Sequence, residues 1–141
     1  MTTATIAIGG EEWPSINIFS VETARASMRA FFQIASAWGL NEEEQQALLG
    51  VPQATLAQWH DGKFPEGLPV ATLERVSHVL NIYSALHTLL PDPRLADDWP
   101  HRPNSAPPFG GNTAITKLVS GSLADLQCVA QYLRSQTDGD F

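Results

Sequence analysis

The chain has 141 residues, of which 43% are hydrophobic and 16% are charged. This length and apolar content fit one packed domain, or two small domains that share a core, and exclude wholesale disorder. Asp and Glu number 15 against 8 for Lys and Arg, and the formal charge of −7 excludes a protein that coats nucleic acid generally, because phosphate binding needs clustered cations.

The first 40 residues are predicted to comprise an arm and a helix. Residues 1–20 contain a Gly-Gly and a Trp-Pro pair, which favour an N-terminal arm. A helix is predicted to begin after Ser20, which suits an N-cap, and to end at Gly39. Its apolar residues mostly recur at the three- and four-residue spacing of a helix with one buried face: Ala24, Met28, Phe31, Phe32, Ala35 and Trp38.

Residues 41–60 have the pattern of two short helices joined by a tight turn. Asn41 and Glu44 have the spacing of a capping box at the start of the first helix, and Gly50 permits a left-handed turn residue after it. A second helix is predicted over residues 53–60. The spacing of the apolar residues is that of a helix-turn-helix motif: Leu48, Leu49, Val51, Leu56 and Trp59.

The second helix of such a motif offers its early residues to the DNA major groove. Glutamine can pair with adenine through two hydrogen bonds, and alanine or threonine can contact a thymine methyl group. The alternative is a helix pair that only packs, and residues 41–66 carry one lysine against five acidic residues. The candidate base-reading residues are Gln53, Ala54, Thr55 and Gln58, and the candidate phosphate contacts are Lys63, Arg25 and Arg29.

The second half of the chain is also predicted to be helical. Pro69 suits the first position of a long helix over residues 69–90, whose two apolar stripes suit a connecting and dimerisation helix. Residues 91–111 are rich in proline and are predicted to be mostly extended and turned. Two helices are then predicted, over residues 113–120 and 122–135.

The fold class is therefore all-α. A helix-turn-helix bundle over residues 21–68, which ends in a loop from residue 61, is joined by the long helix over 69–90 to a small helical domain over 91–141. No stretch of the sequence approaches the roughly 18 apolar residues of a transmembrane helix, and the first residues do not resemble a signal peptide. We therefore expect a cytoplasmic protein without a membrane segment.

The sequence gives little support for an enzyme. No metalloprotease, phosphate-loop or nucleophile-elbow motif occurs, and a single cysteine, Cys128, excludes an intrachain disulfide and a zinc site with several cysteines. His78 and His87 are nine residues apart, which puts them on opposite sides of a helix and prevents them from sharing a metal. We expect no catalytic residues, no metal and no cofactor.

The C-terminal third contains a set of motif residues whose order along the chain is specific enough to indicate a family. The set comprises Trp99 to Asn104, Phe109-Gly110-Gly111, Leu118, Gly121, Val129 to Leu133 and Gly139. This order resembles the toxin-binding domain of Xre/MbcA/ParS-type antitoxins. The preceding part resembles the Xre-like helix-turn-helix region of the same family, at Leu40, Glu43, Leu48 to Val51, Thr55, Trp59 and Gly62. The resemblance covers about residues 30–141, but Asn112-Thr113-Ala114 stands where members commonly have a proline.

The resemblance implies a type II antitoxin whose partner is a RES-domain toxin, a small enzyme that consumes NAD⁺. The antitoxin would do no chemistry itself and would occlude the toxin's active site with its C-terminal segment. It would also bind operator DNA to repress its own operon, as a homodimer within a larger toxin–antitoxin assembly.

The toxin-facing residues are inferred partly from the motif and partly from charge and position. Trp99, Asn104, Phe109 and Gly139 match motif positions. The others are Arg102, Lys117, Arg134, Asp138, Asp140 and Phe141. An acidic tail resembles an anionic dinucleotide in its charge and so suits a basic pocket. The alternative function is a free-standing helix-turn-helix transcription regulator whose C-terminal domain only dimerises.

Overall fold

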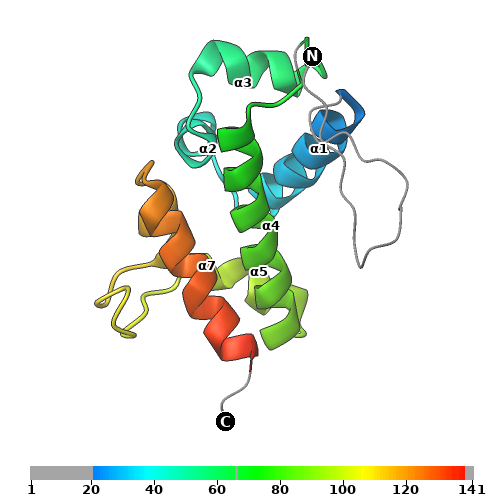
Figure 1. Cartoon of the computed structure of the whole chain (residues 1–141). Helices are drawn as coiled ribbons and strands as arrows, with labels where there is room; N and C mark the ends of the chain where they lie inside the picture. The colour runs from blue at the N-terminus through cyan, green and yellow to red at the C-terminus, as the bar shows by residue number, and fades with distance from the viewer. Residues whose placement is uncertain (1–20, 66, 139–141) are drawn as a thin grey trace, which may run out of the picture.

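The computed structural model describes residues 21–65 and 67–138 of the chain. Over these residues the fold is all-helical, with seven α-helices, one short 3₁₀ helix and no extended strand, which confirms the predicted fold class (Figure 1). The predicted N-terminal arm, residues 1–20, and the tail residues Gly139, Asp140 and Phe141 lie outside the described residues.

Three helices form the N-terminal bundle: α1 (Val21–Ala37), α2 (Glu42–Leu49) and α3 (Gln53–His60). The predicted capping box is present, because the Asn41 side chain accepts a hydrogen bond from the Glu44 amide and the Glu44 carboxylate accepts one from the Asn41 amide. Gly50 ends α2 in the left-handed conformation with a φ of 68°. The boundaries predicted for α3 are therefore confirmed, as is the glycine turn before it.

The long helix α4 (Val70–Leu89) runs through the middle of the molecule (Figure 1). Pro69 is the N-cap of α4 rather than its first helical residue, so the helix begins one residue later than predicted. The buried residues of α4 recur at three- and four-residue spacing on one side: Thr72, Val76, Val79, Ile82 and Leu86. This side faces α1 and α7, the two helices that contact α4 most extensively.

The segment after α4 differs from the prediction. Residues 93–101, expected to be extended and turned, form α5 (Pro93–Asp98) and the 3₁₀ helix η1 (Trp99–His101). The prolines are compatible with these helices because they stand in first turns, where an amide hydrogen has no partner within the helix. The side chain of Asp92 also caps α5 by accepting a hydrogen bond from the amide of Arg94.

The chain ends in α6 (Ala114–Leu118) and α7 (Leu123–Thr137), close to the predicted boundaries. Ser122 caps α7, because its hydroxyl accepts a hydrogen bond from the amide of Asp125. Helix α7 lies beside α4 and runs in the same direction, so that its first turn lies near α2 and its last turn near the end of α4 (Figure 1). The α4–α7 pair therefore spans the molecule from the helix-turn-helix end to the opposite end.

One hydrophobic core joins all of these elements. It contains Phe31 from α1 and Trp38 directly after that helix, Leu48 and Leu49 from α2, and residues of every later α-helix, among them Leu126 of α7. A long-range hydrogen bond connects its two halves, because His101 Nε2 donates to the carbonyl oxygen of Trp38 at 2.6 Å. The N-terminal bundle and the C-terminal helices are therefore packed as one body.

Candidate functional site

Helix α3 exposes the residues predicted to read DNA. Gln53, Ala54 and Gln58 are exposed and Thr55 is half-buried. The opposite side of the helix holds Leu56 and Trp59 in the core. Trp59 stacks on the buried Phe64, with ring centroids 6.5 Å apart, which anchors α3 to the loop that follows it.

Three cations lie on the elements that flank this surface. Arg25, Arg29 and Lys63 are all exposed, and no acidic side chain of the described residues pairs with them. The ring of Phe32 on α1 lies 4.2 Å from the ring of His60 at the end of α3. Arg29 is one turn before Phe32 on α1, so it lies on the side of α1 that faces α3. This placement suits contacts with phosphates on either side of a bound α3.

The other candidate surface is the loop over residues 102–113, which joins η1 to α6. Three aromatic rings lie beneath it: Phe109 meets Tyr132 edge-on at 5.2 Å and Trp99 edge-on at 5.8 Å, and Trp99 stacks on Tyr132 at 6.5 Å. Phe109 is 3% exposed and Trp99 is half-buried. In this structure Phe109 therefore supports the loop from within, and its ring is not offered to a partner.

Hydrogen bonds of Asn104 connect the two sides of this loop. The side-chain oxygen of Asn104 accepts a hydrogen bond from the amide of Ala106 at 2.9 Å, and its backbone bonds Asn112 and Gly111 across the loop at 3.0 and 2.8 Å. Gly110 and Gly111 have φ angles of 56° and 92°, which explains the glycine pair of the motif, since other residues rarely adopt them. The loop is therefore a preorganised surface rather than a free connection.

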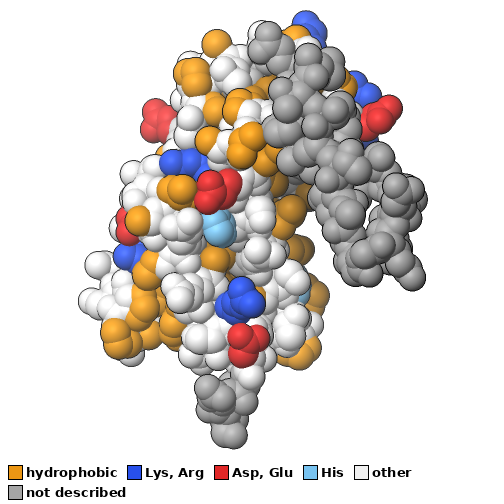
Figure 2. All heavy atoms as spheres, in the orientation of Figure 1, with side chains coloured by type: hydrophobic (Ala, Val, Ile, Leu, Met, Phe, Trp, Pro, Cys, Tyr) orange, Lys and Arg blue, Asp and Glu red, His pale blue; other side chains and the backbone are white. Residues whose placement is uncertain are grey.

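The outer side of the loop is partly apolar, beside the exposed polar residues Arg102, Ser105 and Asn112. Pro103 and Pro107 are exposed, and Ala106 and Pro108 are half-buried. Figure 2 shows hydrophobic side chains gathered at this edge of the molecule, where Figure 1 places the loop. Exposed apolar surface of this kind is typical of a protein–protein contact.

Two of the basic residues predicted to face a toxin, Arg102 and Lys117, form ion pairs with acidic side chains. Arg102 Nε is 2.6 Å from Asp98 Oδ2, and Lys117 Nζ is 3.4 Å from Asp125 Oδ1. The hydroxyl of Ser120 donates to the other oxygen of Asp125 at 2.8 Å. This hydrogen bond, assisted by the nearby ammonium of Lys117, outweighs the desolvation of the carboxylate and lowers the pKa of Asp125 below its usual value. The turn between α6 and α7 is thus fixed by a charged network.

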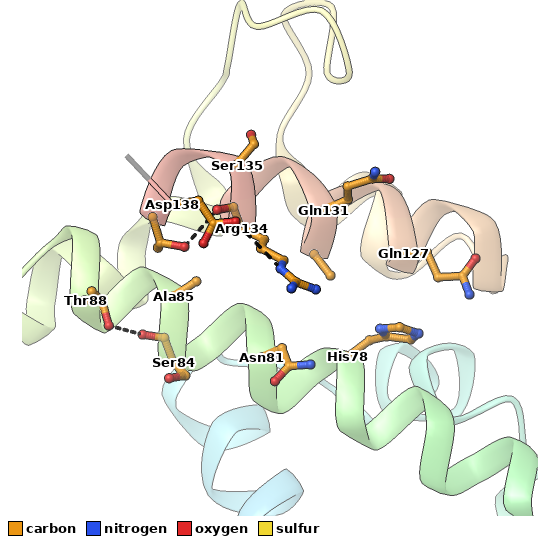
Figure 3. A pocket seen from close by; sticks show the side chains of 12 residues that line it. His78, Asn81, Ser84, Ala85, Thr88, Gln127, Gln131, Arg134, Ser135 and Asp138 are labelled. Carbon is orange, nitrogen blue, oxygen red and sulfur yellow. Dashed lines mark hydrogen bonds and ion pairs between the residues drawn. The ribbon is translucent and has the colours of Figure 1, made fainter. Parts of the chain in front are cut away.

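Arg134 and Asp138, at the other end of α7, line a groove between α4 and α7. The groove has a volume of about 760 Å³. Figure 3 shows its lining, with His78, Asn81, Ser84 and Thr88 from α4 facing Gln127, Gln131 and Arg134 from α7. Arg134 Nε is 3.8 Å from Asp138 Oδ2, and both side chains are exposed. These two residues are where the described chain leads into the predicted tail.

The residues predicted to face a toxin therefore fall into separate groups. Trp99, Arg102, Asn104 and Phe109 belong to one loop and its support, whereas Lys117 lies near the start of α7 and Arg134 near its end. Helix α7 has 15 residues and is about 22 Å long at 1.5 Å per residue. A partner that contacts all three groups has to cover this helix end to end.

Sequence reasoning missed two residues that the structure makes prominent. Tyr132 completes the aromatic support of the loop, and its position among the motif residues between Val129 and Leu133 was the available signal. Arg75 on α4 bonds the backbone of α2 and of the α6–α7 turn, and nothing in the local sequence indicated it. Both residues position the candidate surfaces.

The described residues contain no group of three or more His, Cys, Asp or Glu side chains placed to hold a metal ion. Within the same part of the chain, none of the helices combines the length and the apolar character needed to cross a membrane.

Comparison with known proteins adds two findings. The family model described as "Antitoxin Xre-like helix-turn-helix domain" matches residues 20–81, which include α1 to α3 and the first part of α4. A protein of Sinorhizobium fredii (strain NBRC 101917 / NGR234), described as uncharacterized protein y4oB, is 40% identical over 123 residues. The aligned region covers 85% of this chain and 92% of that relative.

Proposed function

Since the chain belongs to the antitoxin Xre-like helix-turn-helix family, we propose that it is the antitoxin of a type II pair whose toxin is a RES-domain enzyme that consumes NAD⁺. The family match indicates an antitoxin role and implies a toxin partner. The toxin class is inferred from the resemblance of residues 99–139 to the toxin-binding domain of these antitoxins. The single observation that carries the proposal is the family match over residues 20–81.

The proposed inhibition is steric. The preorganised loop over residues 102–113, supported by Trp99 and Phe109, docks on the toxin and loses little entropy in doing so. Helix α7 then directs Asp138 and the tail residues Gly139, Asp140 and Phe141 into the NAD⁺ pocket. Two carboxylates in this short segment match the negative charge of the dinucleotide that the tail displaces.

The second part of the proposal is autoregulation through operator DNA. The exposure of Gln53, Ala54 and Gln58 on α3 supports it, because these side chains are free to reach base edges. Two α3 helices in a dimer would read two half-sites and double the few phosphate contacts that one chain offers.

Deletion of residues 139–141 tests the inhibitory mechanism and leaves α7, which ends at Thr137, intact. We expect the shortened chain to bind the toxin but to stop protecting its pocket, so that NAD⁺ consumption by the purified toxin recovers. Operator binding in a gel shift should be unchanged, because α3 lies at the other end of α4 (Figure 1).

The matched control replaces residues 139–141 with three alanines, which keeps the length of the chain. A tail that acts through the Asp140 carboxylate or the Phe141 ring loses inhibition in both variants, whereas a tail that acts only through its backbone loses it in the deletion alone. Full inhibition by the deleted chain would contradict occlusion by the tail. A wild-type chain that binds operator DNA but neither binds nor silences the toxin would instead support a free-standing transcription regulator.

A further inference from the structure

The side chain of Arg75 on α4 joins segments that are far apart in the sequence. Its Nη1 atom lies 3.3 Å from the carbonyl oxygens of both Ala47 and Leu48, in the last turn of α2. Its Nη2 atom donates to the carbonyl oxygen of Gly121, in the turn between α6 and α7, at 3.0 Å. One guanidinium therefore bonds the helix-turn-helix pair and the C-terminal helices at the same time.

The electrostatics of Arg75 suit this bridging position. No carboxylate pairs with it among the residues that the structure describes, so its charge faces backbone carbonyls alone. The last turn of α2 carries the negative end of the helix dipole and has no basic residue of its own. A planar guanidinium can donate in two directions at once, which the compact ammonium of a lysine does less well.

Arg75 also lies directly over the turn that positions α3. A Cβ atom placed on Gly50 would lie only 3.0 Å from Arg75 Nε, so the guanidinium covers the glycine closely. Gly50 is the left-handed residue at which the chain leaves α2 towards α3. The side chain that reaches Gly121 therefore also fixes the turn on which the orientation of α3 depends.

On its other side, Arg75 meets the charged network of the α6–α7 turn. Gly121 lies between Ser120 and Ser122, whose amide donates to the Ser120 hydroxyl at 3.1 Å. The same hydroxyl donates to Asp125, the ion-pair partner of Lys117. An acidic group of a bound protein that competed for Lys117 would disturb this network within a few bonds of the carbonyl that Arg75 holds.

We propose that Arg75 is a positioning residue through which toxin binding at the C-terminal helices changes the operator affinity of α3. This proposal rests on the toxin–antitoxin function proposed above. It requires that the chain alone and the toxin-bound chain differ in operator affinity, and that the ratio of the two affinities depends on Arg75.

The test compares R75Q and R75K with the wild-type chain. Operator affinity is measured by fluorescence anisotropy with and without saturating toxin, and toxin affinity is measured separately. For the wild type we expect the two operator affinities to differ at least about fivefold, the lower end of typical coupling between sites. For both variants we expect a ratio close to one, with toxin binding retained.

The matched control is R94Q, the same change at an arginine whose side chain is 92% exposed and whose one acidic partner among the described residues is the nearby Asp92. It should keep the wild-type ratio. A wild-type ratio of one, or an unchanged ratio in both Arg75 variants, would overturn the proposal while leaving the antitoxin function in place. Failure of both variants to fold, judged by circular dichroism, would also overturn it, because Arg75 would then serve the fold itself. Absence of toxin binding by the wild-type chain would overturn the antitoxin function and this coupling together.

Discussion

At the scale of single residues, the side chains suited to reading bases on α3 differ from those suited to attracting phosphates. Gln53 and Gln58 are uncharged and can discriminate bases, whereas Lys63 on the following loop carries the charge that attracts phosphates. The helix itself contains no lysine or arginine, so the proposed operator binding by this surface would take its specificity from the glutamines.

Substitution of both glutamines, Gln53→Ala with Gln58→Ala, is expected to weaken specific operator binding. Each lost bidentate contact with a base is worth about 1–3 kcal/mol of discrimination, so the preference over scrambled DNA should fall by at least tenfold. Gel shifts with DNA from upstream of the gene that encodes the chain, and with a scrambled duplex, measure this preference. Inhibition of the toxin should not change.

The same change on another helix provides the control. Gln127 and Gln131 are exposed on α7, so Gln127→Ala with Gln131→Ala removes two glutamines without touching α3. This pair should bind the operator as the wild type does. An unchanged preference in the α3 variant would show that α3 does not read bases.

At the scale of elements, the loop over residues 102–113 depends on its aromatic support. Phe109→Ala should lower the free energy of unfolding by about 3–5 kcal/mol, because the residue is buried and the space it leaves is not filled. Urea unfolding measures this loss. Under conditions where the variant is still folded, toxin affinity should fall and operator affinity should not.

Phe32→Ala is the reciprocal variant, since Phe32 contacts His60 at the end of α3 rather than the loop. It should weaken operator binding and spare toxin binding. If Phe109→Ala bound the toxin normally while folded, the loop would not be part of the toxin contact.

The elements that the sequence predicted well are those with local signals. Asn41 and Glu44 cap α2 within four residues of chain, and Gly50 marks its end, so the helix-turn-helix boundaries followed directly. Helix α5 was missed although Asp92 and Pro93 form a local start signal, because the density of prolines around them favoured an extended segment.

Other features depend on contacts that no local pattern contains. The bonds of Arg75 span 27 to 46 residues, and the bond from His101 to Trp38 spans 63. The sequence likewise left open whether Phe109 fills the core or contacts a partner, since an aromatic residue in a loop is compatible with both. Only the packing of Phe109 on Trp99 and Tyr132 decides this for the free chain.

At the scale of the whole molecule, α3 and the end of α7 that leads into the tail lie at opposite ends of α4 (Figure 1). This helix has 20 residues and is about 30 Å long, with α3 near its start and the last turn of α7 near its end (Figure 1). In the proposed complexes, the tail after α7 enters the toxin at one end of α4 and DNA contacts α3 at the other, so these two contacts would not compete for the same surface. The proposed antitoxin needs this separation in order to bind operator DNA while its tail is held by a toxin.

The charge of the molecule limits how strongly salt can affect operator binding. The chain carries a formal charge of −7, and only Arg25, Arg29 and Lys63 flank α3 as exposed cations. Each neutralised phosphate contributes a slope of about −0.9 to log K against log salt, so a dimer with six such contacts should give a slope of about −5. Lys63→Gln should reduce the magnitude of this slope by about 2, since each dimer loses two contacts, whereas Lys117→Gln, at the only other lysine, should leave it unchanged. A slope near zero, or one that Lys63→Gln does not alter, would mean that phosphates are held by other groups.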